Sequence, residues 1–64
     1  MEFRIDNMTC GGCARSVTRT IQKVDPAAEV AIDVEARRVE VRSSAPSEVF
    51  ATALDAAGFP AAAA

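Results

Sequence analysis

The order of hydrophobic patterns along the chain predicts an α+β fold, a ferredoxin-like βαββαβ sandwich. Period-two alternation, typical of half-buried strands, occurs in residues 2–6 and in two runs between residues 29 and 42. Helical periodicity follows the first strand and again follows the strand pair. We therefore expect an antiparallel four-stranded sheet with two helices on one face and a short or weak last strand. At 64 residues the chain has room for a single domain, residues 1–64, with a small core.

The first strand and the first helix are predicted from residues 2–26. In EFRID, Phe3 and Ile5 share one face, and charged residues occupy the other. From Cys13 onward, apolar side chains recur in one helical sector and basic side chains fall almost opposite. This pattern predicts an amphipathic helix of about 11 residues. It ends at Asp25, because the residue before a proline is disfavoured in the helical region.

Residues 29–42 predict an antiparallel hairpin with its turn near residues 35–37. Val30, Ile32 and Val34 point inward on the first strand, and Val39 and Val41 do so on the second. The outward residues are mostly acidic on the first strand and mostly basic on the second, so ion pairs are expected across the hairpin. These outward residues are Glu29, Asp33, Glu35, Arg38 and Arg42.

A second helix is predicted after the serine- and proline-containing segment SSAPS. Gly58 stands where a left-handed C-cap is favoured. The remaining FPAAAA is a poor strand, because Pro60 cannot donate to a sheet ladder and alanine has little to pack. The apolar stripe of the helix consists of Val49, Phe50, Ala53, Leu54 and Ala57.

Charge is distributed unevenly along the chain. The net charge is −2, from 7 basic and 9 acidic residues, which argues against a nucleic-acid partner. Between Cys13 and Val24 there are three basic residues, Arg15, Arg19 and Lys23, and no acid, so the remainder carries −5. No apolar run approaches the roughly 18 residues of a membrane span, and MEFRID is unlike a signal peptide. We expect a cytoplasmic protein.

Cys10 and Cys13 form a Cys-x-x-Cys pair within MTCGGC. The loop that they would close as a disulfide is too small to stabilise the fold, which favours a chemical role. A structural zinc site needs four ligands, and the chain has no histidine and no second cysteine pair. Two soft thiolates in near-linear coordination suit Cu(I), with Hg(II) as the toxic analogue.

The position of the pair favours thiolates. Cys10 is expected in the loop after the first strand and Cys13 in the opening turn of the first helix, where free amides and the helix dipole stabilise negative charge. Gly11 and Gly12 let the loop turn tightly and leave space above the sulfurs for an incoming thiolate. Arg15 further favours thiolates and offsets the charge of a bis-thiolate Cu(I) site.

MTCGGC, after a strand and at the head of a helix, resembles the Met-x-Cys-x-x-Cys motif of the heavy-metal-associated domain family. The resemblance extends over essentially the whole chain, including VEVRS as third strand and ALDAAGF before the last loop. It implies a βαββαβ domain that binds Cu(I) through Cys10 and Cys13 and is not an enzyme. The family includes small bacterial copper chaperones and the N-terminal metal-binding domains of copper P-type ATPases.

Neighbouring residues refine what the resemblance implies. Zinc-transporting relatives often carry aspartate before the first cysteine; here that residue is Thr9, which favours Cu(I). Many bacterial chaperones have tyrosine after the glycine of the last loop and many ATPase domains have phenylalanine, so Phe59 leaves both assignments open. The alanine tail departs from the family's usual fourth strand. The implied partner is a copper-transporting P-type ATPase, through its Cys-x-x-Cys domains, and copper can bridge two monomers into a dimer.

Three features also have plain structural explanations. Met8 can ligate copper, but it is expected to be buried beneath the loop because two stronger thiolates are available. Phe59 is expected to be a core residue that also shields the flank of the site. Arg15, Arg19 and Lys23 form either a solvated helix face or a docking surface for an acidic partner.

Three functions are compatible with these residues. The first is a cytosolic carrier that holds Cu(I) between its cysteines and passes it to a partner by thiolate exchange. The second is a thiol-disulfide oxidoreductase, although thioredoxin-like folds are longer and keep a proline beside their cysteines. The third is a detached ATPase domain or a mercury-binding relative; Met1 directly before the first strand favours a free-standing protein.

Overall fold

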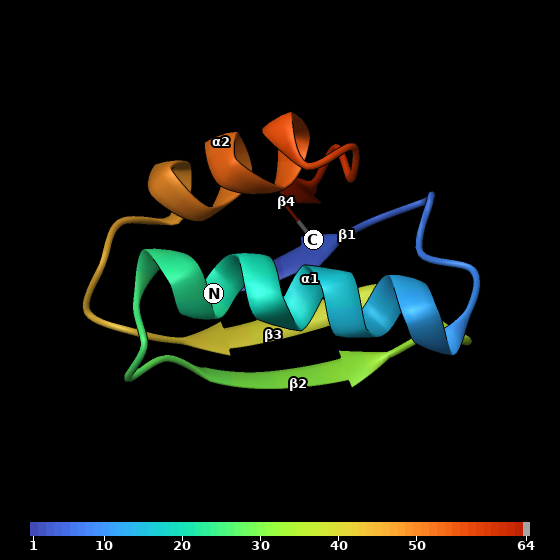
Figure 1. Cartoon of the computed structure of the whole chain (residues 1–64), viewed down its shortest axis with the longest axis horizontal. Helices are drawn as coiled ribbons and strands as arrows, with labels where there is room; N and C mark the ends of the chain where they lie inside the picture. Colours follow the sequence, from blue (N-terminus) through green and yellow to red (C-terminus); the bar gives the residue numbers. More distant parts are fainter. Residues whose placement is uncertain (64) are drawn as a thin grey trace.

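Two helices cover one face of an antiparallel sheet in the computed structural model, which describes residues 1–63 (Figure 1). The strands are β1 (Glu2–Arg4), β2 (Glu29–Asp33), β3 (Arg38–Arg42) and β4 (Ala62–Ala63), and the helices are α1 (Gly11–Val24) and α2 (Ser47–Ala56). The strands lie in the order β2-β3-β1-β4. The predicted α+β class, with two helices on an antiparallel sheet, is confirmed. β4 is a two-residue segment paired with β1, and any extension to residue 64 lies outside the described residues.

The core lies between the helices and the sheet and is entirely apolar. Phe3 and Ile5 alternate with exposed charged residues, as the period-two pattern predicts. Within residues 1–63 no polar or charged residue is buried, so removal of apolar surface from water holds the two layers together. In the same part of the chain, neither helix has the length and apolar composition needed to cross a bilayer. The buried side chains are Phe3, Ile5, Met8, Val17, Ile21, Ala28, Val39, Val41, Phe50 and Leu54.

α1 begins two residues earlier than the prediction from Cys13. Its first residue is Gly11, and Cys10 is the N-cap with an extended backbone, φ −151° and ψ 168°. The N–H of Ala14 donates to the Cys10 carbonyl over 3.1 Å, which closes the first turn. The hydrophobic periodicity of the sequence does not indicate this first turn, because glycines add no side chain to the apolar stripe. The predicted end of the helix is confirmed, since Asp25 is the C-cap.

β2 and β3 form the predicted hairpin, but the ion pairs predicted across it are wrong among the described residues. Arg38 contacts Glu2 on β1 at 3.5 Å, and Arg42 contacts Glu40 on its own strand at 3.5 Å. A long guanidinium side chain reaches acids on several neighbouring positions, so register alone does not select its partner. All four side chains are exposed, and such pairs contribute little to stability. The residues that face each other across the hairpin are Glu29 with Arg42 and Asp33 with Arg38.

The hairpin turn occupies residues 34–37. Val34, predicted as the last inward residue of the first strand, therefore lies in the turn and is half-buried. Its carbonyl accepts the N–H of Arg37 over 3.1 Å, and the Asp33 side chain accepts the N–H of Ala36 over 3.1 Å. Arg37 has φ 57°, a left-handed conformation that the turn requires.

α2 ends in the predicted glycine cap. Gly58 has φ 90°, and its N–H donates to the Asp55 carbonyl over 3.0 Å. The N–H of Phe59 donates to the Leu54 carbonyl over 2.8 Å, which completes a Schellman motif. Glycine takes this conformation without a Cβ penalty, which explains its place at position 58.

The apolar face of α2 is narrower than the predicted stripe. Phe50 and Leu54 are fully buried, as expected, and Ala53 is half-buried. Val49 and Ala57 are exposed, Val49 to 44%. The helix buries one edge against α1 and the sheet, and residues at the margin of the stripe remain in solvent.

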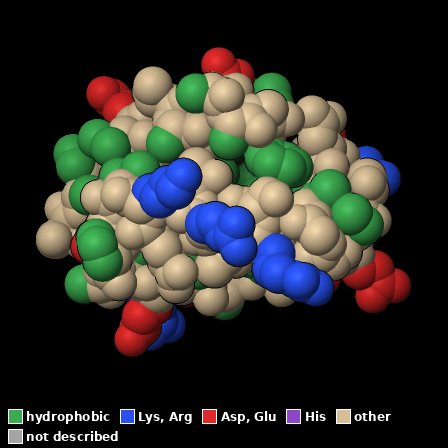
Figure 2. Space-filling view, in the orientation of Figure 1, with side chains coloured by type: hydrophobic (Ala, Val, Ile, Leu, Met, Phe, Trp, Pro, Cys, Tyr) green, Lys and Arg blue, Asp and Glu red, His purple; other side chains and the backbone are tan. Residues whose placement is uncertain are grey.

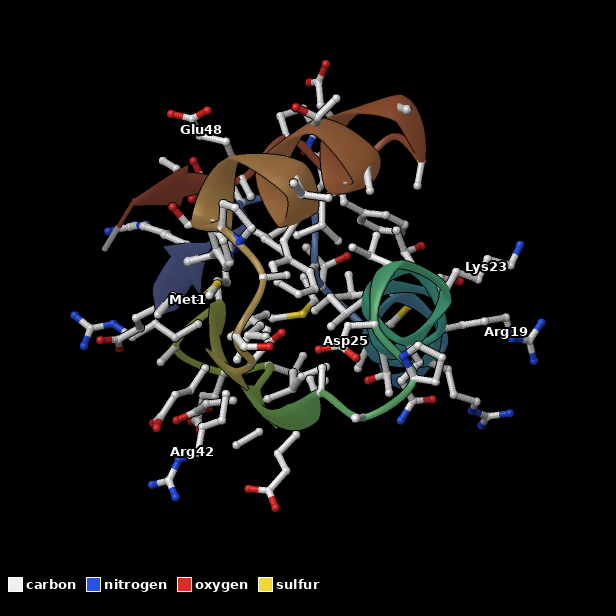
Figure 3. The ribbon with its side chains drawn as sticks, turned by 90° about the vertical axis from the view of Figure 1, so that its left-hand side faces the viewer. Met1, Arg19, Lys23, Asp25, Arg42 and Glu48 are labelled. Atoms are coloured by element: carbon white, nitrogen blue, oxygen red, sulfur yellow. The ribbon has the colours of Figure 1, made fainter. Side chains whose placement is uncertain are left out.

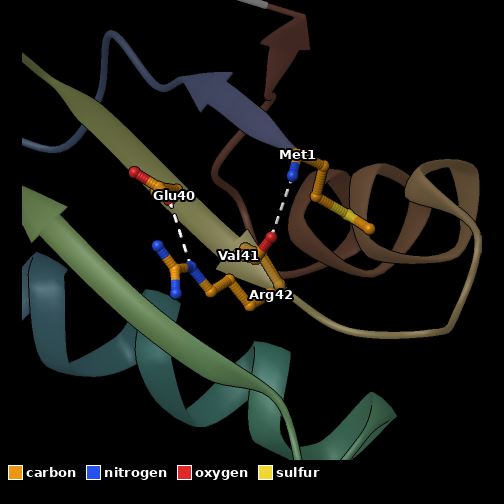
Figure 4. Close-up of polar contacts among 4 residues, drawn as sticks. All are labelled: Met1, Glu40, Val41 and Arg42. Carbon is orange, nitrogen blue, oxygen red and sulfur yellow. Dashed lines mark hydrogen bonds and ion pairs between the residues drawn. The ribbon is translucent and has the colours of Figure 1, made fainter.

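Two polar links join segments that are far apart in sequence. The N-terminal ammonium of Met1 donates to the Val41 carbonyl over 2.9 Å, which aligns the start of β1 with β3 (Figure 4). The hydroxyl of Ser43 donates to the carboxylate of Asp25, so the loop after β3 is tied to the end of α1. This hydrogen bond, followed by that of the Ala27 N–H, lowers the pKa of Asp25 below its usual value.

Replacing Asp25 with asparagine is expected to reduce the acid sensitivity of the fold. Because the pKa of Asp25 is lower in the folded chain than in the unfolded chain, the carboxylate stabilises the fold at pH values above its unfolded-state pKa. This contribution is lost as the pH falls through the lower, folded-state pKa. Urea unfolding from neutral pH downward should show a larger drop in the free energy of unfolding for the wild type than for Asp25→Asn. Equal drops would contradict the role of Asp25; Asp6→Asn, which removes an exposed ion pair with Arg4, is the control.

Candidate metal centre

The two cysteines meet at the N-terminal end of α1. Cys10 is the N-cap and Cys13 is the third residue of the helix, so both lie in its first turn. Their sulfur atoms are 3.1 Å apart, and both are free thiols. Cys10 is exposed, whereas Cys13 is half-buried and packs against the core. One sulfur is thereby open to an incoming partner while the other is anchored.

The environment of Cys10 favours its thiolate. The hydrogen bond with the Cys13 side chain lowers the pKa of Cys10 most, and the backbone N–H groups of Cys13 and Gly12 lower it further. These N–H groups belong to the first helical turn, where they have no helical acceptor. The turn contains no acidic residue to oppose negative charge. The thiolate is the form of cysteine that binds metal ions.

The candidate donor set consists of two sulfurs, those of Cys10 and Cys13. Within residues 1–63, no group of three or more histidine, cysteine, aspartate or glutamate side chains is placed to hold a metal ion. A four-ligand zinc site cannot be built from this set, whereas a soft ion of low coordination number needs only two thiolates. The two sulfurs are 3.1 Å apart. They must move farther apart to coordinate one ion in a near-linear arrangement, because each metal–thiolate bond is about 2.3 Å long, as for zinc.

Met8 and Thr9, which precede the pair, lie in different environments. Met8 is completely buried, and its N–H donates to the Ile5 carbonyl over 3.2 Å. The prediction that Met8 is a core residue is confirmed. Thr9 is exposed. Burial of Met8 holds one end of the cysteine loop against the core, while the residues that follow it project toward solvent.

The loop after α2 lies against the cysteine loop. Phe59 is half-buried and packs on the core, as predicted. The side-chain amide of Asn7 donates to the Gly58 carbonyl over 3.3 Å and joins the two loops. Asn7 was not predicted as part of the site. Its partner lies 51 positions away in the chain, so no local pattern marks it.

Gly11 and Gly12 are not needed for a tight turn, so that prediction is wrong. Both residues belong to α1, and within residues 1–63 the left-handed glycine conformation occurs at Gly58 instead. A Cβ on Gly11 would meet no atom within 4 Å. A Cβ on Gly12 would meet the Cys10 sulfur at 3.8 Å, an ordinary contact. The absence of side chains here leaves open space beside the sulfurs.

Arg15, Arg19 and Lys23 form a line of exposed side chains along α1, which we call the basic row. Figure 2 shows the three basic side chains in line across this face, with acidic groups at its margins. Arg19 and Lys23 point away from the body of the protein in Figure 3. None of the three belongs to an ion pair within residues 1–63. Their charge is therefore available to a partner.

The chain matches the family model of the heavy-metal-associated domain over residues 2–60. It is 37% identical to the copper transport protein ATOX1 of Rattus norvegicus over 57 residues, which cover 89% of this chain and 81% of that protein. It is 40% identical over 42 residues to a copper transport protein ATOX1 homologue of Dictyostelium discoideum. That match covers 66% of this chain and 61% of the relative, less than two thirds of its length.

Solved structures share the fold over nearly the whole chain. A gold binding protein superimposes with a TM-score of 0.93 and is 49% identical, covering 95% of this chain and 94% of its own. The copper chaperone Atx1 of Synechocystis PCC6803, in a trimeric form, also has a TM-score of 0.93, with 27% identity and coverage of 97% and 98%. Relatives named for two different soft metals thus have this fold.

Alanine at Gly11 is expected to stabilise the protein, and alanine at Gly58 to destabilise it. Both sites have open space for a Cβ, but only Gly58 has a positive φ. Thermal unfolding should show a gain of about 0.5 kcal/mol for Gly11→Ala and a loss of about 1 kcal/mol or more for Gly58→Ala. Destabilisation by Gly11→Ala would show that its backbone freedom is required after all.

Proposed function

We propose that this chain, which belongs to the heavy-metal-associated domain family, is a copper metallochaperone that carries Cu(I) on Cys10 and Cys13. The observation that carries the proposal is the pair of free sulfurs at the N-terminus of α1, which are 3.1 Å apart and have no further metal-ligating side chains grouped with them among residues 1–63. Two thiolates satisfy Cu(I) and leave zinc under-coordinated. The names of the ATOX1 relatives and of the Synechocystis Atx1 structure support copper as the cargo.

Transfer proceeds by exchange of thiolates. The exposed Cys10 sulfur faces solvent, and the open space beside Gly11 and Gly12 admits a thiolate of the partner's own Cys-x-x-Cys pair. Copper passes through three-coordinate states, in which an incoming thiolate binds before an outgoing one leaves. The half-buried Cys13 holds the ion until the second partner thiolate arrives. Thr9 and Phe59 border this route, and Met8 supports the loop from the core.

The basic row guides the partner to the cysteines. It starts at Arg15, two residues after Cys13, and none of its charges is used within the described residues. The partner is the Cys-x-x-Cys domain of a copper-transporting P-type ATPase that presents an acidic surface. The chain works in the cytoplasm as one heavy-metal-associated domain, residues 1–64. It is a monomer without metal and can form a copper-bridged dimer.

Gold is the second candidate cargo. The gold binding protein is 49% identical to this chain. This identity is higher than that of the copper proteins named above. Au(I) has the same preference for two soft thiolates as Cu(I), so the same sulfur pair suits both ions. The geometry of two sulfurs does not discriminate between them, and Hg(II) belongs to the same class.

Anaerobic titration of the reduced protein with Cu(I), against a colorimetric copper chelator, is expected to show one ion per chain. Cys10→Ser and Cys13→Ser should each weaken binding at least about tenfold, because a hydroxyl is a poor ligand for a soft ion. Met8→Leu keeps the buried volume and should leave affinity within about threefold. Zn(II) should bind far more weakly.

Two results would change the assignment, one from the Cu(I) titration and one from a parallel titration with Au(I). Failure to compete for Cu(I), combined with sustained disulfide reduction by the same preparation, would replace the carrier with an oxidoreductase. Titration with Au(I) in the same format decides the cargo. Tighter binding of Au(I) than of Cu(I) by the wild type, and its loss in both serine variants, would make gold the preferred ion.

We expect neutralisation of the basic row to slow copper transfer to an acidic partner domain. The triple variant combines Arg15→Gln, Arg19→Gln and Lys23→Gln. The on-rate should fall about tenfold at low salt and lose most of its salt dependence, because steering charges act at long range. Stopped-flow transfer at several salt concentrations measures both effects.

The matched control neutralises three arginines on the opposite face of the sheet, Arg4, Arg38 and Arg42. It changes the net charge by the same amount, and the exposed ion pairs that it removes contribute little. If both triple variants slow transfer equally, overall charge and not the basic row controls the encounter.

A further inference from the structure

Among residues 1–63, β2 is an edge strand whose outer row of backbone N–H and C=O groups has no partner. It lies at one end of the sheet order β2-β3-β1-β4. The N–H of Ile5 donates to the Arg37 carbonyl, and the N–H of Val41 donates to the Met1 carbonyl. The backbone N–H and C=O groups of the odd-numbered residues of β3 therefore point toward β1. Because the direction of these groups alternates along a strand, the backbone groups of the even-numbered residues of β3 point toward β2. These pair with residues 29, 31 and 33, so the N–H and C=O groups of Val30 and Ile32 face outward.

A groove runs along this edge, between β2 and α1. Val30, Ile32 and Ala14 provide apolar walls, and Arg15 and Arg19 line the side formed by α1. Figure 1 shows α1 extending alongside β2. Both arginines are exposed and have no ion pair among residues 1–63. The groove thus combines unused hydrogen-bonding groups with unused positive charge.

We propose that this groove binds an extended acidic segment of a partner protein, which joins the sheet as an additional strand beside β2. The backbone of the segment would pair with the free groups of Val30 and Ile32, as in other cases of strand addition. Side chains on the helix side of the added strand would then lie beside Arg15 and Arg19. Acidic residues at alternate positions fit this arrangement.

The spacing of the two arginines along α1 matches the spacing of alternate residues along the added strand. Arg15 and Arg19 are one helical step of four residues apart, which is about 6 Å along the axis at 1.5 Å per residue. Alternate residues of a strand are about 6.7 Å apart, at roughly 3.3 Å per residue. Two acids separated by one residue can therefore face the two arginines at the same time. The intervening residue points to the other face, beside the exposed Glu29, Ala31 and Asp33, where a further acid would be repelled.

A second copy of the chain is a poor occupant of the groove. Pairing two β2 edges would bring two α1 helices together, and the basic row of each would face that of the other. The acids of β2 do not relieve this repulsion, because Glu29 and Asp33 lie on the opposite face of the sheet from α1. The basic row therefore protects the edge from self-association and leaves it open to an acidic strand.

The test uses a capped peptide of alternating residues, Glu-Thr-Glu-Thr-Glu-Thr, and the reduced, metal-free protein. Amide hydrogen exchange, followed by NMR, is measured for Val30 and Ile32 with and without peptide. We expect both amides to exchange at least about tenfold more slowly at saturation, because they become paired. The amide of Ala31, which faces β3, provides an internal reference and should change little. Since no metal is used, the result is independent of the copper proposal.

Two control peptides and two double variants isolate strand addition. A peptide with N-methylated backbone amides, and a peptide of the same composition in the order Glu-Glu-Glu-Thr-Thr-Thr, should both bind at least about threefold more weakly. Arg15→Gln with Arg19→Gln should weaken binding about tenfold. Arg38→Gln with Arg42→Gln, an equal charge change on the opposite face of the sheet, should not. Binding of all three peptides with equal affinity, or binding without protection of Val30 and Ile32, would overturn the proposal and leave only non-specific attraction to the basic row.

Discussion

Burial of Met8 is the constraint on which the candidate metal centre depends. The loop between β1 and α1 has only a few residues, and Met8 anchors it because its side chain is completely buried in the core. The chain must then leave the core and begin α1 almost at once, with Cys10 as the N-cap. This places the Cys10 sulfur beside the free amides of the first turn and brings it to 3.1 Å from Cys13. Packing in the core thereby controls the chemistry at the surface.

The local features of the fold could be predicted, because their causes lie within a few residues. Alternation located the strands, Asp25 before a proline ended α1, and Gly58 formed the expected cap. Features that depend on distant residues could not be predicted. The hydrogen bonds of Asn7 to Gly58 and of Ser43 to Asp25 join loops that no pattern relates.

The predictions that the structure contradicts have a common physical origin, because side-chain type alone carries limited information. Glycine at the head of α1 suggested a turn, whereas the backbone there is already helical. Opposite charges in register suggested ion pairs across the hairpin, but flexible guanidinium groups found other acids. Val49 matched the helical stripe of α2 but lies beyond the width of the packed surface. For the centre itself, residue type was sufficient to place the two sulfurs together, because their spacing in a helix leaves few alternatives.

The separation of charge has a consequence for how the molecule moves before it touches anything. With +3 on one helix and −5 on the rest of the chain, the protein has a dipole whose positive end lies along α1. In the field of a negatively charged body, the net charge of −2 is repelled, but the dipole experiences a torque. This torque turns the molecule until α1 faces the negatively charged body. Because the cysteines stand at one end of that helix, rotational diffusion is biased toward orientations in which the sulfurs arrive near the front, and fewer collisions are wasted.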